Sequence, residues 1–115
     1  MTALHANLVA RAQHLMSADL SSLWTIDDLA HACNTSPSTL KTAFRTQTGE
    51  PIASWQRRIH MEAACDMMRE FPNRSIASIA ADVGYANPSK FSRAFCSCIG
   101  TTPSTWKKAH REDVG

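Results

Sequence analysis

The chain has 115 residues, which is enough for one domain with a modest hydrophobic core. Its hydrophobic content of 43% is ordinary, and its net charge of +2 indicates no particular class of partner. No apolar run approaches the roughly 18 residues of a membrane span and no signal peptide is visible, so we expect no association with a membrane. Alternating strand patterns are also absent. The sequence therefore predicts an all-α fold with about seven helices.

Two helices are predicted in the first 33 residues. Apolar residues at helical spacing indicate an amphipathic helix over about 3–18. A second helix spans about 26–33 and starts with a capping-box-like pair, Thr25 and Asp28. Trp24 precedes this cap and fits a hydrophobic staple, so we favour a packed ring over the alternative of a base-stacking platform.

The third predicted helix carries a polar stripe. It spans about 36–48, starts with the N-cap Ser36 followed by Pro37, and ends at Gly49. Its inward face is apolar: Leu40, Ala43 and Phe44. Its outward stripe is polar and basic: Ser38, Lys41, Thr42 and Arg45. Lysine and arginine can pair with guanine or phosphate, and serine and threonine can contact several bases, so these four residues are candidate DNA-binding residues.

A long linker helix is predicted from Pro51 to about Glu70. Its apolar residues are spaced to face both flanking subdomains: Ile52, Trp55, Ile59, Ala63 and Met67. Twenty helical residues rise about 30 Å, close to the roughly 34 Å between successive major-groove faces of B-DNA. Arg57 and Arg58 could contact phosphate or pair within the domain. For Arg58 we favour pairing, because a charge buried between subdomains needs a partner.

The stretch 75–103 has the pattern of a helix-turn-helix. A short helix over about 75–83 is stopped by Gly84, and a second helix over about 87–99 starts at Asn87. The inward positions of this second helix are Phe91, Ala94, Phe95 and Cys98. Its candidate DNA-binding residues are Asn87, Ser89, Lys90 and Arg93. The second helix of such a motif can enter a DNA major groove, although an ordinary helical hairpin is the alternative.

An internal repeat favours a DNA-binding helix-turn-helix over an ordinary helical hairpin. Residues 25–33 match residues 75–83 at an offset of 50, and residues 36–49 match residues 87–100 at an offset of 51. The matching positions are mostly core and capping positions. The outward positions differ, with Lys41, Thr42 and Arg45 in the first copy and Ser92, Arg93 and Cys96 in the second. The two copies therefore suggest two helices that recognise different DNA sequences. A solenoid is the competing explanation of the repeat, but it would need more than two units.

Positive charge is concentrated around the two candidate recognition helices. Residues 31–60 and 85–115 each carry a net charge of +3, whereas residues 1–30 and 61–84 each carry −2. This distribution is typical of a phosphate-facing surface, although a randomly mixed solvated surface could also produce it.

A last helix is predicted to start at Thr102 and Pro103, with Trp106 inward. Its Lys107, Lys108 and Arg111 form a basic tail. Lys107 and Lys108 are candidate phosphate contacts, and a solvated helix C-terminus explains the basic tail equally well.

The cysteines and histidines indicate no catalytic or metal site. Cys33 and Cys65 fall on apolar faces and are expected in the core. Cys96 and Cys98 are two residues apart and point to opposite sides of a helix, so they make a poor metal pair. Redox sensing by Cys96 is a less favoured hypothesis. Because no nucleophile signature or glycine-rich phosphate loop is present, we expect a protein that is not an enzyme and has no cofactor or metal.

These motifs together resemble the signature of the AraC/XylS family of bacterial transcription regulators. The matching positions in the second half are Ile79-Ala80, Gly84-Tyr85, Ser89, Phe91-Ser92-Arg93, Phe95, Gly100 and Thr102-Pro103. Those in the first half are Leu29-Ala30, Ser36, Leu40, Phe44, Gly49, Arg58 and Ala63. The likeness covers about residues 5–108. It implies two helix-turn-helix subdomains over 1–50 and 72–115, joined by a linker helix over 51–71.

The resemblance also implies a function. Family members bind double-stranded promoter DNA in adjacent major grooves and usually activate transcription through RNA polymerase in the bacterial cytoplasm, at promoters within the nucleoid. By position, the family's base-reading sites fall on Ser38, Lys41 and Thr42, and on Pro88, Ser89, Lys90 and Arg93. Cys96 lies where the family often has a basic residue, which implies that the second helix-turn-helix binds DNA phosphates more weakly. The run from Asn87 to Phe91 is similar to regulators of siderophore uptake, which hints at iron-linked control.

Many family members carry a separate effector or dimerisation domain, and nothing in these 115 residues can serve as one. We therefore expect either a stand-alone regulator or, with slight preference, the DNA-binding fragment of a longer one. The contrasting hypothesis is an α-helical protein-interaction module that binds an acidic partner through its Lys and Arg faces.

Overall fold

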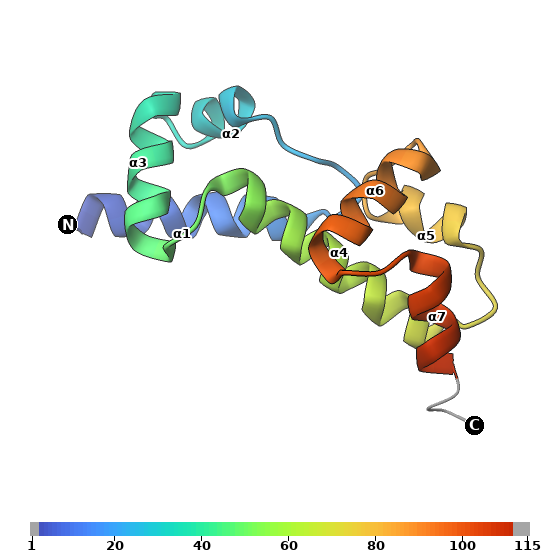
Figure 1. Cartoon of the computed structure of the whole chain (residues 1–115). Coiled ribbons are helices and arrows are strands. Elements are labelled where there is room, and N and C mark those ends of the chain that lie inside the picture. The colour runs from blue at the N-terminus through green and yellow to red at the C-terminus, as the bar shows by residue number, and fades with distance from the viewer. Residues whose placement is uncertain (1–2, 112–115) are drawn as a thin grey trace. The chain divides into compact units, whose positions relative to one another are not determined.

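The computed structural model describes residues 3–111, and the side chains of residues 6–110 (Figure 1). The described residues form seven helices: α1 (Ala3–Ala18), α2 (Ile26–Ala32), α3 (Pro37–Thr48), α4 (Ile52–Glu70), α5 (Ile76–Asp82), α6 (Pro88–Ile99) and α7 (Pro103–Arg111). No strand occurs in this part of the chain, so the predicted all-α class is confirmed, and each helix lies where the sequence predicts it. Within residues 3–111, none of the helices has the length and apolar character needed to span a membrane.

The chain divides into two compact units, and α4 contributes to both. The first unit contains α1, α2, α3 and the start of α4 up to Gln56. The second contains α4 from Arg57 onward, α5, α6, α7 and the short segment Leu20–Ser22. Each unit therefore has one helix-turn-helix, formed by α2 and α3 or by α5 and α6.

The first unit is held together by apolar side chains from all of its helices. α1 packs against α2 and α3. Its fully enclosed side chains are Ala12, Met16, Leu29, Leu40 and Phe44. Phe44 also meets Trp55 of α4 edge to face, with ring centroids 5.7 Å apart. The inward face predicted for α3 is confirmed, because Leu40, Ala43 and Phe44 are all buried.

Trp24 fastens the segment before α2 to two neighbouring helices. Its indole Nε1 donates a hydrogen bond to the carbonyl oxygen of Leu15 in α1, at 3.1 Å. Its backbone N–H donates to Oε1 of Gln56, and the Nε2 of Gln56 donates to its backbone carbonyl, at 2.8 and 3.1 Å. The ring is half-buried, so the predicted packed position is confirmed. The Thr25 cap also forms, because its hydroxyl accepts from the Asp28 N–H at 3.1 Å.

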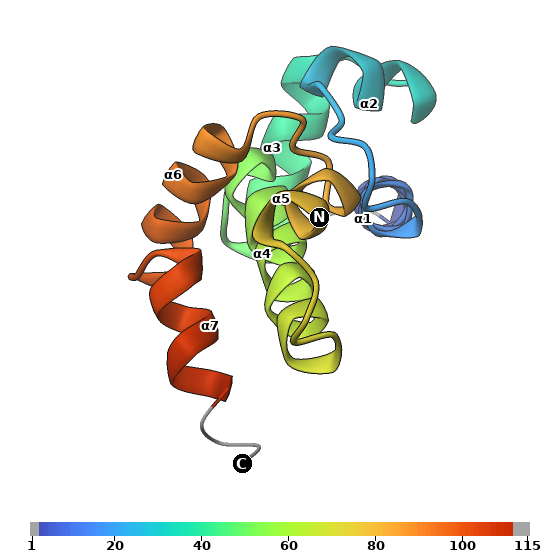
Figure 2. The ribbon, with the colours of Figure 1, turned by 90° about the vertical axis from the view of Figure 1, so that its right-hand side faces the viewer.

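The second unit has its own core, in which α5, α6 and α7 lie around the C-terminal part of α4 (Figure 2). The stripe predicted for α4 is confirmed in part, because Ala63 and Met67 are half-buried and pack against this core, and Ile59 is also half-buried. The most deeply buried side of α4 lies one position further along the chain. The enclosed residues are His60, Met61, Ala64, Cys65 and Met68. The apolar pattern passed over this face because it includes a histidine.

One inward position predicted for α6 is also wrong. Cys98 is exposed, whereas Phe91 and Phe95 are fully buried. Ile99 takes the next inward place and packs against the core. It lies four residues after Phe95, which is the helical step that keeps a side chain on the same face.

The internal repeat reappears in the backbone of the two turns. After α2, the N–H of Thr35 donates to the carbonyl of Ala30 at 3.0 Å; after α5, the N–H of Tyr85 donates to the carbonyl of Ala80 at 2.8 Å. The residue before each donor has a positive φ, 58° at Asn34 and 91° at Gly84. Glycine and asparagine are the residues that accept this conformation most readily, so two different residue types form the same turn.

Candidate nucleic-acid interface

The outward face of α3 is set by its cap and by its buried face. The hydroxyl of Ser36 accepts a hydrogen bond from the N–H of Thr39 at 3.1 Å, which starts the helix in the expected register. Leu40 and Phe44 are fully buried on one side. The four predicted DNA-binding residues on the other side are all exposed: Ser38, Lys41, Thr42 and Arg45. A polar, positively charged stripe therefore runs along α3.

The corresponding face of α6 is built in the same way. Oδ1 of Asn87 accepts hydrogen bonds from the N–H groups of Ser89 and Lys90, at 2.8 and 3.2 Å. The predicted site residues Ser89, Lys90 and Arg93 are exposed, as is Asn87. Because the amide oxygen of Asn87 caps the helix, its first role in the structure is to orient α6.

The two outward faces carry different chemistry at equivalent positions. The offset of 51 pairs Thr42 with Arg93, and Arg45 with Cys96. Cys96 is exposed, so the second unit presents a thiol where the first presents a guanidinium. Arginine offers a planar fork of donors suited to guanine, whereas threonine offers one hydroxyl, so the two faces suit different base sequences.

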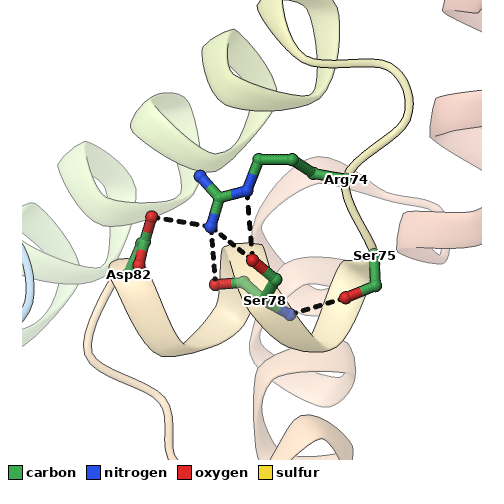
Figure 3. Close-up of polar contacts among 4 residues, drawn as sticks. All are labelled: Arg74, Ser75, Ser78 and Asp82. Atoms are coloured by element: carbon green, nitrogen blue, oxygen red, sulfur yellow. Dashed lines mark hydrogen bonds and ion pairs between the residues drawn. The ribbon is translucent and has the colours of Figure 1, made fainter.

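Arg74 is the centre of a polar network at the start of α5 (Figure 3). The Arg74 guanidinium bonds to the hydroxyl and carbonyl oxygens of Ser78 and pairs with the Asp82 carboxylate at 2.8 Å. Nζ of Lys107 donates to the backbone carbonyl of Arg74 at 2.7 Å and is therefore engaged within the second unit. Lys108 is exposed, and the side chain of Arg111 lies outside the described residues. Trp106 is buried as predicted.

Arg58 has the structural partner that was predicted, but for a different reason. Its Nη1 lies 3.1 Å from Oε1 of Glu62, one turn further along α4. Both side chains are largely exposed, at 44% and 57%. The expected burial of this charge between subdomains is therefore wrong, and the pair is of the surface type worth about 0.3–0.5 kcal/mol.

His60 is a buried residue whose importance the sequence did not indicate. It is fully enclosed, and its Nδ1 lies 2.9 Å from the carbonyl oxygen of Val83, the residue that ends α5. Carbonyl groups at a helix C-terminus have no partner within the helix, so His60 satisfies one of them. The carbonyl acceptor places the proton on Nδ1, and Nε2 has no hydrogen-bond partner. Gln56, one helical turn earlier, is also buried, but no pattern in the sequence marks either polar residue as part of the core.

Three of the four cysteines lie where the sequence predicts them, with Cys98 as the exception. Cys33 and Cys65 are buried and Cys96 is exposed. Burial raises the pKa of the Cys65 thiol to about 11, although the positive charge of Arg69 acts in the opposite direction. Within residues 3–111, no three His, Cys, Asp or Glu side chains come together as a group that could hold a metal ion.

Comparison with known proteins defines the family. The profile of the helix-turn-helix domain family matches residues 29–109, which extend from α2 to α7 and so include parts of both units. An AraC-like transcription regulator from Streptomyces lividans is 35% identical over 101 residues. The chain belongs to the AraC/XylS family. This membership favours DNA binding over the alternative of a module for an acidic protein partner.

The relatives of this AraC/XylS-family chain are longer proteins. The match to the Streptomyces lividans regulator covers 88% of this chain and 33% of that protein. The arabinose operon regulatory protein of Escherichia coli is 32% identical over 84 residues, which cover 73% of this chain and 28% of that protein. The chain thus spans about a third of the length of these relatives.

Solved structures share the fold. The C-terminal domain of AraT, a response regulator from Geobacillus stearothermophilus, has a TM-score of 0.85 at 26% identity, covering 89% of this chain and 84% of that one. The DNA-binding domain of AdpA, solved in complex with a target DNA, has a TM-score of 0.77 at 22% identity, with 97% of this chain and 96% of that one covered. At that identity, the second likeness concerns the fold alone.

Proposed function

We propose that this chain binds double-stranded promoter DNA by placing α3 and α6 in two successive major grooves. The observation that carries the proposal is the repeated geometry of these helices. Each begins at a side-chain cap, buries one apolar face in its own unit and exposes a polar face with at least one long cation. This is the arrangement that a recognition helix needs to present side chains to base edges.

The linker helix supports the proposed spacing. α4 has 19 residues, which rise about 28 Å at 1.5 Å per residue. Successive major grooves on one side of B-DNA lie about 34 Å apart, so a single helix of this length can connect two readers of adjacent grooves. We therefore propose half-sites whose centres are about 10 base pairs apart.

The exposed side chains divide into base readers and phosphate contacts. Lys41 and Arg93 lie in the N-terminal halves of the two outward faces, where recognition helices approach base edges. We assign Arg93 to a guanine, because its planar guanidinium can donate two hydrogen bonds to the O6 and N7 acceptors. We assign Lys41 to a contact through its single ammonium group. We assign Lys108 to phosphate, whereas the Lys107 ammonium is already engaged with the Arg74 carbonyl.

The wider role follows the family. We propose that the chain regulates transcription in the bacterial cytoplasm, as an activator that contacts RNA polymerase at the promoter. The relatives are about three times as long as this chain, and we assign effector binding and dimerisation to parts of such a regulator that these 115 residues do not include.

Competition among DNA duplexes tests the base-reading assignment. A binding site is first selected from random duplexes, and its single-base variants then compete for the protein. Arg93→Ala should lose about 1–3 kcal/mol on the selected site and lose its preference at one base pair. Lys108→Ala is the matched control, because loss of a phosphate contact should weaken binding to all duplexes equally and reduce the salt slope by about one.

The salt dependence tests DNA binding itself. With roughly 5–9 phosphate contacts, the logarithm of affinity should fall with the logarithm of salt concentration at a slope of about −4 to −8. Binding that does not change between low and physiological salt would contradict the proposed function. Equal losses on every variant duplex for Arg93→Ala would instead make Arg93 a phosphate contact.

A further inference from the structure

A pocket lies at the base of the recognition helix in the first unit. Its volume is about 170 Å³. It is formed where the start of α2, the outward face of α3 and the start of α4 meet, and its lining residues are Ile26, Lys41, Arg45, Pro51, Ile52 and Ala53. Four of these six residues are apolar, and the other two are cations. The pocket therefore combines an apolar surface with positive charge.

The side chains of the two cations have no partner in the part of the chain that the structure describes. Lys41 and Arg45 lie four residues apart on one face of α3, and neither the Lys41 ammonium nor the Arg45 guanidinium forms a hydrogen bond or ion pair with another described residue. Like charges at this spacing repel each other, so an anion between them would relieve the repulsion. A cavity of about 150 Å³ lined by apolar side chains can hold a benzene-sized molecule, which sets the size of a suitable ligand at about six carbons.

The internal repeat shows that the fold does not require this charge. The equivalent corner of the second unit carries Ile76, Ser92, Cys96, Thr102, Pro103 and Ser104. Its apolar residue at the first position is kept, but both cations are replaced by small uncharged side chains. The same helix-turn-helix therefore forms with no cation at either position, and Lys41 and Arg45 are available for another role.

We propose that this pocket binds a small amphiphilic carboxylate of about six carbons. Its hydrocarbon part would lie against Ile26, Ile52 and Ala53, and its carboxylate would pair with Lys41 and Arg45. Binding of the carboxylate does not depend on the proposed function, whereas its competition with DNA rests on that function. Because both cations belong to the DNA-facing stripe, carboxylate and DNA compete for them, and each weakens the binding of the other by the same factor.

Hexanoate is the probe for the site. In a titration followed by NMR without DNA, the methyl signals of Ile26, Ile52 and Ala53 should shift, with a dissociation constant on the order of 1–10 mM, as expected for a ligand of this size. Acetate should bind at least about tenfold more weakly, because it lacks the methylene groups that contact the apolar surface. 1-Hexanol should also bind more weakly, because it lacks the charge. Absent shifts, or equal affinity for acetate, would overturn the proposal.

Two variants separate the pocket from DNA binding. Ala53 is exposed on α4, so Ala53→Leu should fill the pocket without disturbing the core and should weaken hexanoate binding about tenfold or more. Ser104→Leu changes the equivalent exposed position of α7 and should bind hexanoate like the wild type. Unaltered hexanoate binding by Ala53→Leu would refute the assignment of the site.

The competition is then measured on a selected duplex. Hexanoate should lower the DNA affinity of the wild type and of Ser104→Leu but leave that of Ala53→Leu unchanged. If no variant bound DNA in the absence of hexanoate, the proposed function would fail while the NMR result on the pocket stood. If hexanoate bound in the pocket and DNA affinity did not change, the competition would be refuted.

Discussion

Replacing Phe95 with alanine should destabilise the second unit and leave the stability of the first largely unchanged. Phe95 is fully buried, and its ring centroid lies 5.7 Å from that of Phe91 and 6.3 Å from that of Trp106. Truncation of a buried phenylalanine costs about 3–5 kcal/mol, which includes the loss of such ring contacts. Small domains have a total stability of about 5–15 kcal/mol, so this loss removes much of the stability of one unit.

Amide hydrogen exchange measures the effect unit by unit. In Phe95→Ala, exchange in α5 and α6 should become faster by roughly 100- to 4000-fold, because each 1.4 kcal/mol of the lost 3–5 kcal/mol changes an equilibrium tenfold. Exchange in α1 and α3 should change little. Phe44→Ala is the matched variant in the first unit, since Phe44 is equally buried and meets Trp55. It should give the reverse pattern.

Two results would refute this reasoning. Equal acceleration in α1, α3, α5 and α6 for both variants would show that the two units unfold as one cooperative body. Unchanged exchange in α5 and α6 for Phe95→Ala would show that Phe95 does not support the core of the second unit.

Two further predictions concern a cap and a thiol. Asn87→Ala removes the acceptor of two backbone N–H groups and should lower the free energy of unfolding by about 1 kcal/mol, whereas Asn87→Asp, which keeps the acceptor, should lose less in a denaturant titration. The pKa of Cys65 is about 11 in the folded protein and 9.0 for a free thiol. Above pH 9 the unfolded chain therefore loses this proton first, so stability should fall between about pH 9 and 11 and then level off. Cys65→Ala should show a shallower fall, and an identical pH profile would contradict the assigned burial of the thiol.

The sequence by itself determined the seven helices and most of their exposed faces. Ser36, Ser75 and Asn87 each cap a helix through a backbone N–H two or three residues away. Such contacts depend only on near neighbours in the chain, so they can be recognised from short patterns. The same holds for the outward stripe of α3, which follows from helical periodicity once Leu40 and Phe44 are assigned to the core.

Tertiary structure alone decided which polar groups are engaged and where a pocket forms. The His60 ring meets the Val83 carbonyl across 23 residues, and Lys107 meets the Arg74 carbonyl across 33 residues. Two adjacent lysines thus have different surroundings, because Lys107 is hydrogen-bonded to Arg74 and Lys108 is exposed. The buried side of α4 also follows from packing, because a helix with apolar residues on more than one side can turn either to the core. Contacts of this kind depend on how helices distant in sequence come together, and the periodicity of one helix carries no information about its neighbours.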